Sequence, residues 1–125
     1  MNQEEELTAV VTTLKRLRVD KVTMEYELQN QIAKILDTAG IGYEREYQLG
    51  PRNRVDFLTE HGIAIEVKKG KPNKAQVISQ LERYAKHSQV KAVILCIETS
   101  LNIPKTIKGK PCIAFGLQKL WGIAI

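Results

Sequence analysis

The sequence predicts a single α/β domain in which helices flank a mixed β-sheet. Its 125 residues, 43% of them apolar, suit one chain with one hydrophobic core. Two amphipathic helical patterns precede three strand patterns, and a further helical pattern leads to a near-continuous apolar run at residues 90–97. Such a run is typical of a strand that is buried on both faces. Because a strand–helix–strand order favours a parallel crossover, we expect parallel as well as antiparallel pairing.

The first expected element is a helix over residues 3–18. Its apolar side chains recur at intervals of three and four residues: Leu7, Val10, Val11, Leu14 and Leu17. Acidic residues occupy its first turn and basic residues its last, which complements the helix dipole. The N-terminal segment 1–20 is therefore expected either to pack on the core or to form a dimer contact.

A second helix is expected over residues 24–39, with Thr23 as its N-cap and Gly40 as its C-terminal stop. Glu25 lies three residues before Leu28, so we expect it to project from the same apolar stripe. A carboxylate on a core-facing stripe is costly unless it is paired. Glu25 is thus a candidate functional acid; the alternative is that it simply lies near the backbone donors of the first turn.

The remaining elements follow from alternation, apolar runs and turn residues. Gly50-Pro51 marks the first turn between strands, and a loop containing Gly70 and Pro72 precedes the third helix. In chain order, the expected elements are strands at 43–49, 53–59 and 63–68, a helix at 74–87, a strand at 90–97, and short strands at 113–115 and 121–125.

Residues 56–68 carry the strongest functional pattern. Thr59 to Ile63 indicates a three-residue hairpin loop, with Gly62 where a positive φ is needed. Counting outward from that closing pair places Leu58 opposite Ala64 and Asp56 opposite Glu66. Because side chains alternate along a strand, two faces are expected. One face would carry Arg54, Asp56, Ala64, Glu66 and Lys68, and the other Val55, Phe57, Ile63, Ile65 and Val67.

This arrangement suits metal-assisted hydrolysis of a phosphodiester. Like charges directly across a sheet are destabilising unless something neutralises them. A hard, oxygen-ligated ion, Mg²⁺ or Mn²⁺, is the simplest candidate for Asp56 and Glu66, with the Val67 carbonyl and Glu25 as further ligands. The ion would activate a water and offset charge on the phosphate. Lys68 would orient or deprotonate that water, or stabilise the transition state.

A structural alternative is a charged, solvated sheet face, in which Lys68 pairs with Glu66 and Arg54 with Asp56. The charge distribution favours the catalytic interpretation. The chain has a net charge of +5, and Lys68, Lys69, Lys71 and Lys74 cluster directly after the hairpin. A basic rim beside an acidic centre suits a polyanionic substrate. For a second cluster, at Lys105, Lys108 and Lys110, a solvated loop is an equally good explanation.

Other function classes have little support. Cys96 and Cys112 each lie in an apolar run, so buried thiols in a reducing, cytoplasmic setting are expected rather than a disulfide. Two histidines give no basis for a histidine zinc site, and no glycine-rich phosphate loop occurs. No segment approaches the roughly 18 apolar residues of a membrane span, so no membrane association is expected.

Arg54-Val55-Asp56-Phe57-Leu58, followed by Ile63-Ala64-Ile65-Glu66-Val67-Lys68, resembles the core signature of the PD-(D/E)xK nuclease superfamily. Restriction enzymes and archaeal Holliday junction resolvases share that restriction-endonuclease-like fold. The likeness spans about residues 24–97, which would be the catalytic core of a single nuclease domain. Val55 departs from the signature, since it stands where the name-giving proline would be.

The resemblance implies roles for individual residues. Asp56, Glu66 and Lys68 match the metal-binding and catalytic triad, and Glu25 matches an upstream helical acid. On the following helix, Gln80 matches a glutamine that several branches place at the cleft. Gln76, Gln80 and Tyr84 are spaced four apart, so they lie along one edge of that helix. A boundary glutamine and a half-buried tyrosine without a role at the cleft explain Gln80 and Tyr84 equally well.

The expected function is a Mg²⁺- or Mn²⁺-dependent DNA endonuclease, structure-specific or nicking. Nucleic acid would be held through phosphates by these residues: Lys69, Lys71, Lys74, Arg52, Arg54 and Tyr84. Resolvase-like enzymes cut two strands symmetrically, which would imply a homodimer. One alternative is an inactive nucleic-acid-binding module that retains the fold. Another is an assembly subunit in which the hairpin charges form salt bridges.

Overall fold

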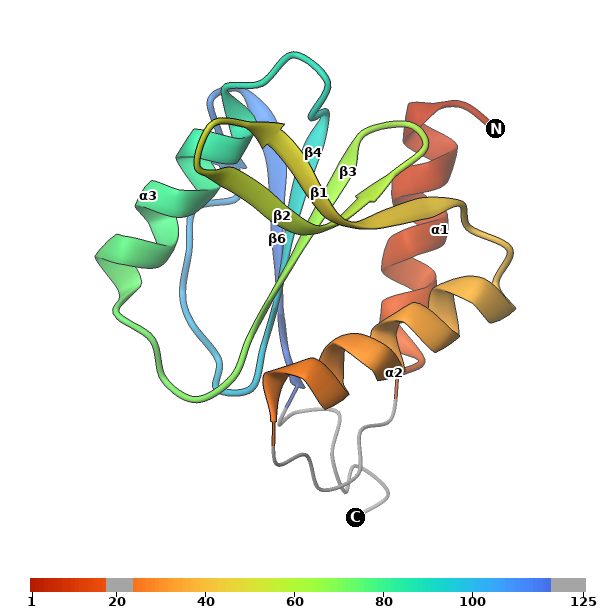
Figure 1. Ribbon diagram of the computed structural model, residues 1–125, viewed down its shortest axis with the longest axis horizontal. Helices are drawn as coiled ribbons and strands as arrows, with labels where there is room; N and C mark the ends of the chain where they lie inside the picture. The colour runs from red at the N-terminus through yellow and green to blue at the C-terminus, as the bar shows by residue number, and fades with distance from the viewer. Residues whose placement is uncertain (18–23, 118–125) are drawn as a thin grey trace.

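The computed structural model describes residues 1–17 and 24–117. It is an α/β structure with three helices around a mixed, six-stranded sheet (Figure 1). The helices are α1 (Gln3–Lys15), α2 (Glu25–Thr38) and α3 (Lys74–Ala85). The strands are β1 (Tyr43–Gly50), β2 (Asn53–Thr59), β3 (Ile63–Lys68), β4 (Ala92–Ile97), β5 (Thr106–Ile107) and β6 (Lys110–Gly116).

The strand order is β1-β2-β3-β4-β6-β5. β1, β2 and β3 pair antiparallel, whereas β3, β4 and β6 pair parallel, so the expected mixed sheet is confirmed. Every residue of β4 is buried, as its apolar run predicted. The two-residue strand β5, which pairs antiparallel with β6, was not predicted.

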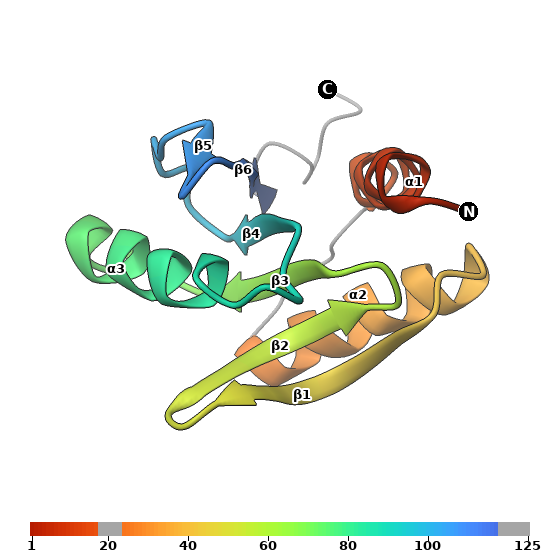
Figure 2. The same cartoon turned by 90° about the horizontal axis from the view of Figure 1, so that it is seen from above.

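Helices cover both faces of the sheet (Figure 2). α1 and α2 pack on one face, in a core cluster that contains Val10, Leu14, Ile32 and Phe57. α3 packs on the other face, in a second cluster that contains Leu81. The apolar stripe of α1 is thus used within its own chain, and core packing accounts for it without a dimer contact.

The ends of α2 show why its predicted limits were nearly right. At its C-terminus Gly40 has φ +73°, and Ile41 donates to the Leu36 carbonyl at 3.0 Å, which closes the last turn. At its N-terminus the cap is Met24, and the predicted cap Thr23 lies outside the described residues. The prediction that Glu25 faces the core is wrong. The first turn of α2, Glu25 included, is exposed, and Leu28 is the first core residue of this helix.

The other boundaries differ by a few residues. α1 ends at Lys15 and α3 at Ala85, each earlier than predicted, and β4 begins at Ala92. The predicted strand at 113–115 is confirmed as part of β6, and the one predicted at 121–125 lies outside the described residues. Cys96 and Cys112 are buried and free, and burial raises the pKa of their thiols to about 12 and about 11.

Candidate active site

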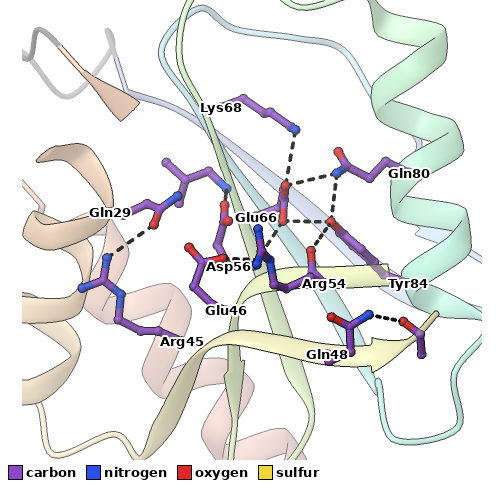
Figure 3. Close-up of polar contacts among 12 residues, drawn as sticks. Gln29, Arg45, Glu46, Gln48, Arg54, Asp56, Glu66, Lys68, Gln80 and Tyr84 are labelled. Atoms are coloured by element: carbon purple, nitrogen blue, oxygen red, sulfur yellow. Dashed lines mark hydrogen bonds and ion pairs between the residues drawn. The ribbon is translucent and has the colours of Figure 1, made fainter. Parts of the chain in front are cut away.

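Asp56 and Glu66 meet where β2 and β3 separate. The ladder between these strands holds at Phe57–Ile65 and Leu58–Ala64, which confirms the predicted register. Beyond the Phe57–Ile65 pair, the backbone amides of Asp56 and Val67 bind carboxylate side chains instead of backbone carbonyls of the facing strand. The Asp56 amide donates to Glu66 Oε1 at 3.3 Å, and the Val67 amide donates to Asp56 Oδ2 at 2.7 Å (Figure 3). The two carboxylates are therefore fixed side by side at the point of separation, as the sequence predicted.

One residue of β2 is on the face opposite to the predicted one. Val55 packs in the α3 cluster, whereas Phe57 packs on the α1/α2 side. The pairing of β1 with β2 goes from Arg45–Phe57 to Tyr47–Val55, and Glu46 between them has φ +52°. The prediction for Val55 was wrong because strict alternation is interrupted beside Asp56, where the hairpin is locally irregular.

Glu66 is 4% exposed and is held from three sides. Its Oε1 accepts from the Tyr84 hydroxyl at 3.2 Å, and its Oε2 accepts from Gln80 Nε2 at 3.3 Å. Lys68 Nζ forms an ion pair with the same Oε2 at 3.3 Å. Figure 3 shows Lys68, Gln80 and Tyr84 converging on this carboxylate. The carboxylate is consequently fixed in position, with a cation next to it.

Both carboxylates hold their protons more tightly than usual. Burial, opposed by the hydrogen bond from Val67, raises the pKa of Asp56 to about 6. Burial and the neighbouring Asp56 raise the pKa of Glu66 to about 7, and Lys68 opposes this shift. Two such acids need a compensating positive charge to be ionised together near neutral pH. One lysine supplies that charge only in part.

Tyr84 holds the carboxylate pair from α3 but offers no surface to a ligand. Its side chain is 2% exposed, so the prediction that it contacts nucleic acid directly is wrong. Its hydroxyl lies 2.9 Å from the Arg54 carbonyl and accepts from Gln80 Nε2 at 2.9 Å. Burial, and then the nearby Glu66, raise the pKa of this phenol above its ordinary value. Tyr84 therefore ties α3 to both β2 and Glu66.

Val67 presents its backbone to the gap that holds Asp56. Its amide donates to Asp56, and the amide and carbonyl of one strand residue point to the same side. The Val67 carbonyl consequently faces the gap too, in agreement with its predicted place among the oxygen ligands. Asp56 Oδ1 accepts no hydrogen bond from residues 1–17 or 24–117, so one oxygen of this carboxylate is left for another partner.

The structure does not bring Glu25 into the pair. Its Oε1 accepts from the Lys69 amide at 3.1 Å, just beyond β3, and its charge contributes to the raised pKa of Asp56. Within the described part of the chain, no three His, Cys, Asp or Glu side chains are grouped to hold a metal ion. Asp56 and Glu66 would therefore need a backbone carbonyl, water or substrate oxygens to complete a coordination shell.

The predicted phosphate contacts occupy different surroundings. Lys71 and Lys74 are exposed on the loop after β3 and the start of α3, and Arg52 is exposed in the β1–β2 turn with φ +63°. Lys69 forms an ion pair with Glu98 at 3.9 Å. Arg54 is paired with Glu46 at 3.2 Å rather than with Asp56, so that part of the salt-bridge alternative is wrong.

The second basic cluster has a structural role in part. Lys110 Nζ donates to the carbonyls of Ala85 and His87, at 2.6 and 3.0 Å, and so caps the end of α3. Burial and the charge of Lys91 lower its pKa. Lys105 and Lys108 are exposed beside the turn between β5 and β6. Of the predicted interpretations, a solvated loop fits these two lysines.

Sequence reasoning missed two acids. Glu98 follows β4 and accepts from the Gly70 amide at 2.9 Å, so it fastens the loop that carries the lysines. Its position directly after a buried parallel strand was an available signal. Glu6 is 2% exposed and binds Thr59 and His61 in the hairpin loop. Its position among the acidic residues at the start of the helix gave no signal of this role.

Within residues 1–17 and 24–117, no helix combines the length and the apolar character that a bilayer crossing requires. Comparisons with protein-family models, with curated proteins and with solved structures give no match to this chain.

Proposed function

We propose that this protein is a Mg²⁺- or Mn²⁺-dependent nuclease that hydrolyses phosphodiester bonds, acting on DNA as an endonuclease. The observation that carries the proposal is the Asp56–Glu66 pair at the separation of β2 and β3, with Lys68 bound to Glu66. A purely structural salt bridge would pair one acid with one base. Here a buried acid, Glu66, and a half-buried acid, Asp56, lie beside one lysine, which is paired with Glu66, and this arrangement leaves a deficit of positive charge.

The donor set suits a hard divalent cation. Two carboxylates and the Val67 carbonyl supply oxygen ligands only, which is the preference of Mg²⁺ and Mn²⁺. The raised pKa values of Asp56 and Glu66 indicate the missing charge, and Asp56 Oδ1 has no hydrogen-bond donor among residues 1–17 and 24–117. When bound, the ion would supply Lewis-acid activation of water and charge neutralisation at the phosphate.

The protein groups have separable tasks in this chemistry. The Val67 amide fixes Asp56, while Tyr84 and Gln80 fix Glu66, so that the ligands need little reorganisation. The Lys68 ammonium lies beside the pair, where it stabilises negative charge that develops on the phosphate or orients the attacking water. Lys68 is 24% exposed at its side chain, which leaves it accessible to a substrate.

We also propose that the core is restriction-endonuclease-like and belongs to the PD-(D/E)xK superfamily. The hairpin β2–β3, which carries Asp56 and Glu66-x-Lys68, lies within a mixed sheet with α2 and α3 on opposite faces. This arrangement supports the proposal. Glu25 would then act at the margin of the site, through the Lys69 amide, and not as a ligand.

Substrate binding would run mainly through phosphates. Three of the predicted phosphate contacts are exposed: Lys71, Lys74 and Arg52. Lys71 and Lys74 follow the end of β3, and Arg52 lies in the turn between β1 and β2. Contacts of this kind position a nucleic acid and make its affinity salt-dependent, with little reading of sequence. Structure-specific or nicking activity agrees with such contacts better than sequence-specific cleavage does.

The direct test is cleavage by purified protein of plasmid, single-stranded, flapped and four-way-junction DNA, with Mg²⁺, Mn²⁺ or EDTA. We expect metal-dependent products that disappear in both Asp56→Asn, which removes the negative charge of a metal ligand, and Lys68→Ala, which removes the ammonium group beside the pair. Nucleic-acid binding should persist in both variants. Glu44→Gln, an exposed acid on β1, is the matched control and should cut normally.

Three outcomes separate the candidates. Cleavage that survives both substitutions in EDTA would falsify the assigned site. Tight, metal-independent DNA binding without turnover on any substrate would indicate the inactive binding module instead. The absence of both a Mn²⁺ binding heat in calorimetry and a DNA mobility shift would indicate an assembly subunit.

A further inference from the structure

A pocket of about 220 Å³ lies beside the carboxylate pair, between the end of β3 and α3. Its volume is several times the roughly 30 Å³ that one water occupies in the liquid, so it has room for a phosphate group. Its polar lining consists of two cations and three amides, with no carboxylate: Lys68, Arg83, Asn73, Gln76 and Gln80. Cations and amide donors together are the chemistry that recognises an anion.

The pocket is continuous with the proposed catalytic centre. Lys68 and Gln80 line it, and each also contacts Glu66 Oε2, at 3.3 Å in both cases. Figure 3 shows Gln80 between Glu66 and α3, and the Lys68 ammonium above Glu66. An anion in the pocket would therefore share the Lys68 ammonium with the carboxylate pair.

The α3 side of the pocket is ordered by helix geometry. Gln76, Gln80 and Arg83 follow a spacing of four and then three residues, which places them on one face of the helix. Arg83 Nη1 donates to Ser79 Oγ at 3.3 Å, while the side chain is exposed. A guanidinium has five N–H donors, so this single bond leaves most of them available for a ligand.

The lining differs from that of a larger pocket elsewhere. The pocket of about 460 Å³ beside Tyr43 and Tyr47 is lined by Glu44 and Glu60 and by no lysine or arginine. That chemistry would repel a phosphate. The pocket next to Glu66, with two cations and no carboxylate, suits an anion better.

We propose that the pocket beside α3 is a subsite for a backbone phosphate that neighbours the scissile one, with Arg83 and Gln76 as its specific contacts. This inference rests on the proposed nuclease function and extends it. It assigns roles to two residues that the triad pattern does not include. It also sets the path of the bound strand, which would run from the Asp56–Glu66 pair along α3.

The test is the salt dependence of DNA binding, measured by fluorescence anisotropy of a labelled 20-nucleotide strand and its duplex with Ca²⁺ present. Wild type, Arg83→Ala, Gln76→Ala and the control Lys86→Ala are compared between 50 and 250 mM KCl. Lys86 is an exposed cation at the end of α3, outside the pocket. We expect Arg83→Ala to weaken binding about tenfold at low salt and to reduce the salt slope by about 0.7–0.9. Lys86→Ala should change neither by more than about twofold.

Cleavage kinetics then separate the two proposals. Arg83→Ala should raise KM about tenfold with kcat nearly unchanged, whereas Asp56→Asn should lose kcat. Normal cleavage by Arg83→Ala, with the wild-type KM and salt slope, overturns the subsite and leaves the nuclease standing. An Arg83-dependent slope without any cleavage supports the subsite and overturns the nuclease. Absence of binding to both DNA forms and to RNA of the same sequence overturns both.

Discussion

The Val67 amide donates to Oδ2 of Asp56 at 2.7 Å, where a continued antiparallel ladder would have supplied a backbone carbonyl of β2. This substitution of a side chain for the backbone keeps the β3 amide satisfied while the strands separate. It also orients one acid toward the other. The contacts that satisfy the backbone where β2 and β3 separate are therefore the same contacts that position the two carboxylates.

The first prediction concerns pH. Asp56 and Glu66 have folded-state pKa values of about 6 and about 7, above their ordinary values. The folded protein therefore binds more protons than the unfolded chain between about pH 4 and pH 7, and stability falls as pH rises through that window. Asp56→Asn and Glu66→Gln should each raise the free energy of unfolding at pH 8 by at least about 1 kcal/mol in EDTA. Urea unfolding at pH 8 and pH 4.5 measures this.

The gain should shrink at pH 4.5, because the wild-type acids are then largely protonated in the folded state. Glu44→Gln, on the exposed side of β1, should show no gain at either pH. Equal stabilities of wild type and both site variants at pH 8 would contradict the raised pKa values.

The second prediction concerns metal-linked stability. An ion that binds only the folded protein adds about 2.7 kcal/mol at 100 times its Kd, which raises Tm by several degrees for a chain of this size. We expect Mn²⁺ to raise the Tm of wild type at pH 8 and Asp56→Asn to lose this response. The shift should be smaller at pH 6, because the ligands must first ionise. Differential scanning calorimetry provides the measurement, and a shift retained in Asp56→Asn would place the ion elsewhere.

The third prediction concerns Tyr84. Tyr84→Phe removes the hydroxyl that contacts Glu66, Gln80 and the Arg54 carbonyl. We expect a stability loss of about 1 kcal/mol and a fall in kcat of about tenfold, because Glu66 is no longer held. KM for DNA should stay unchanged, since the buried ring makes no substrate contact. Tyr26→Phe, at a 59% exposed position on α2, is the control. Equal kcat in wild type and Tyr84→Phe would remove the positioning role.

The fourth prediction concerns Glu6, a buried acid that joins α1 to the loop between β2 and β3. It accepts from the Thr59 hydroxyl, the His61 amide and His61 Nδ1. Hydrogen bonds to a charged acceptor contribute about 1.5–3 kcal/mol, so Glu6→Gln should lower the free energy of unfolding by about 2 kcal/mol. Glu4→Gln, in the same helical turn but exposed, should cost less than about 0.5 kcal/mol. Chemical denaturation compares the two variants. Equal losses of the free energy of unfolding would show that the contacts of Glu6 with Thr59 and His61 do not stabilise the fold.

The sequence by itself determined the elements and the pairing at the centre of the site. Alternation and the loop at Gly62 were enough to place Leu58 opposite Ala64 and, by extension, Asp56 beside Glu66. The apolar run of β4 and the helix before it were enough to predict a parallel neighbour for β3. Local periodicity carries this information because strand and helix repeats are fixed by backbone geometry.

Only the tertiary structure decided which side chains close around those acids. Val55 lies on the face opposite to the predicted one, beside the positive φ of Glu46 on β1 and the side-chain contacts that replace the ladder at Asp56. Tyr84 lies buried under Glu66, and Glu25 turns to the Lys69 amide, because helix packing sets their depth and direction. Glu6 reaches a loop 53 residues away at Thr59, a contact that no local pattern encodes. Periodicity indicates which residues share a face where the backbone is regular, but the burial and partners of a side chain arise only when separate elements pack together.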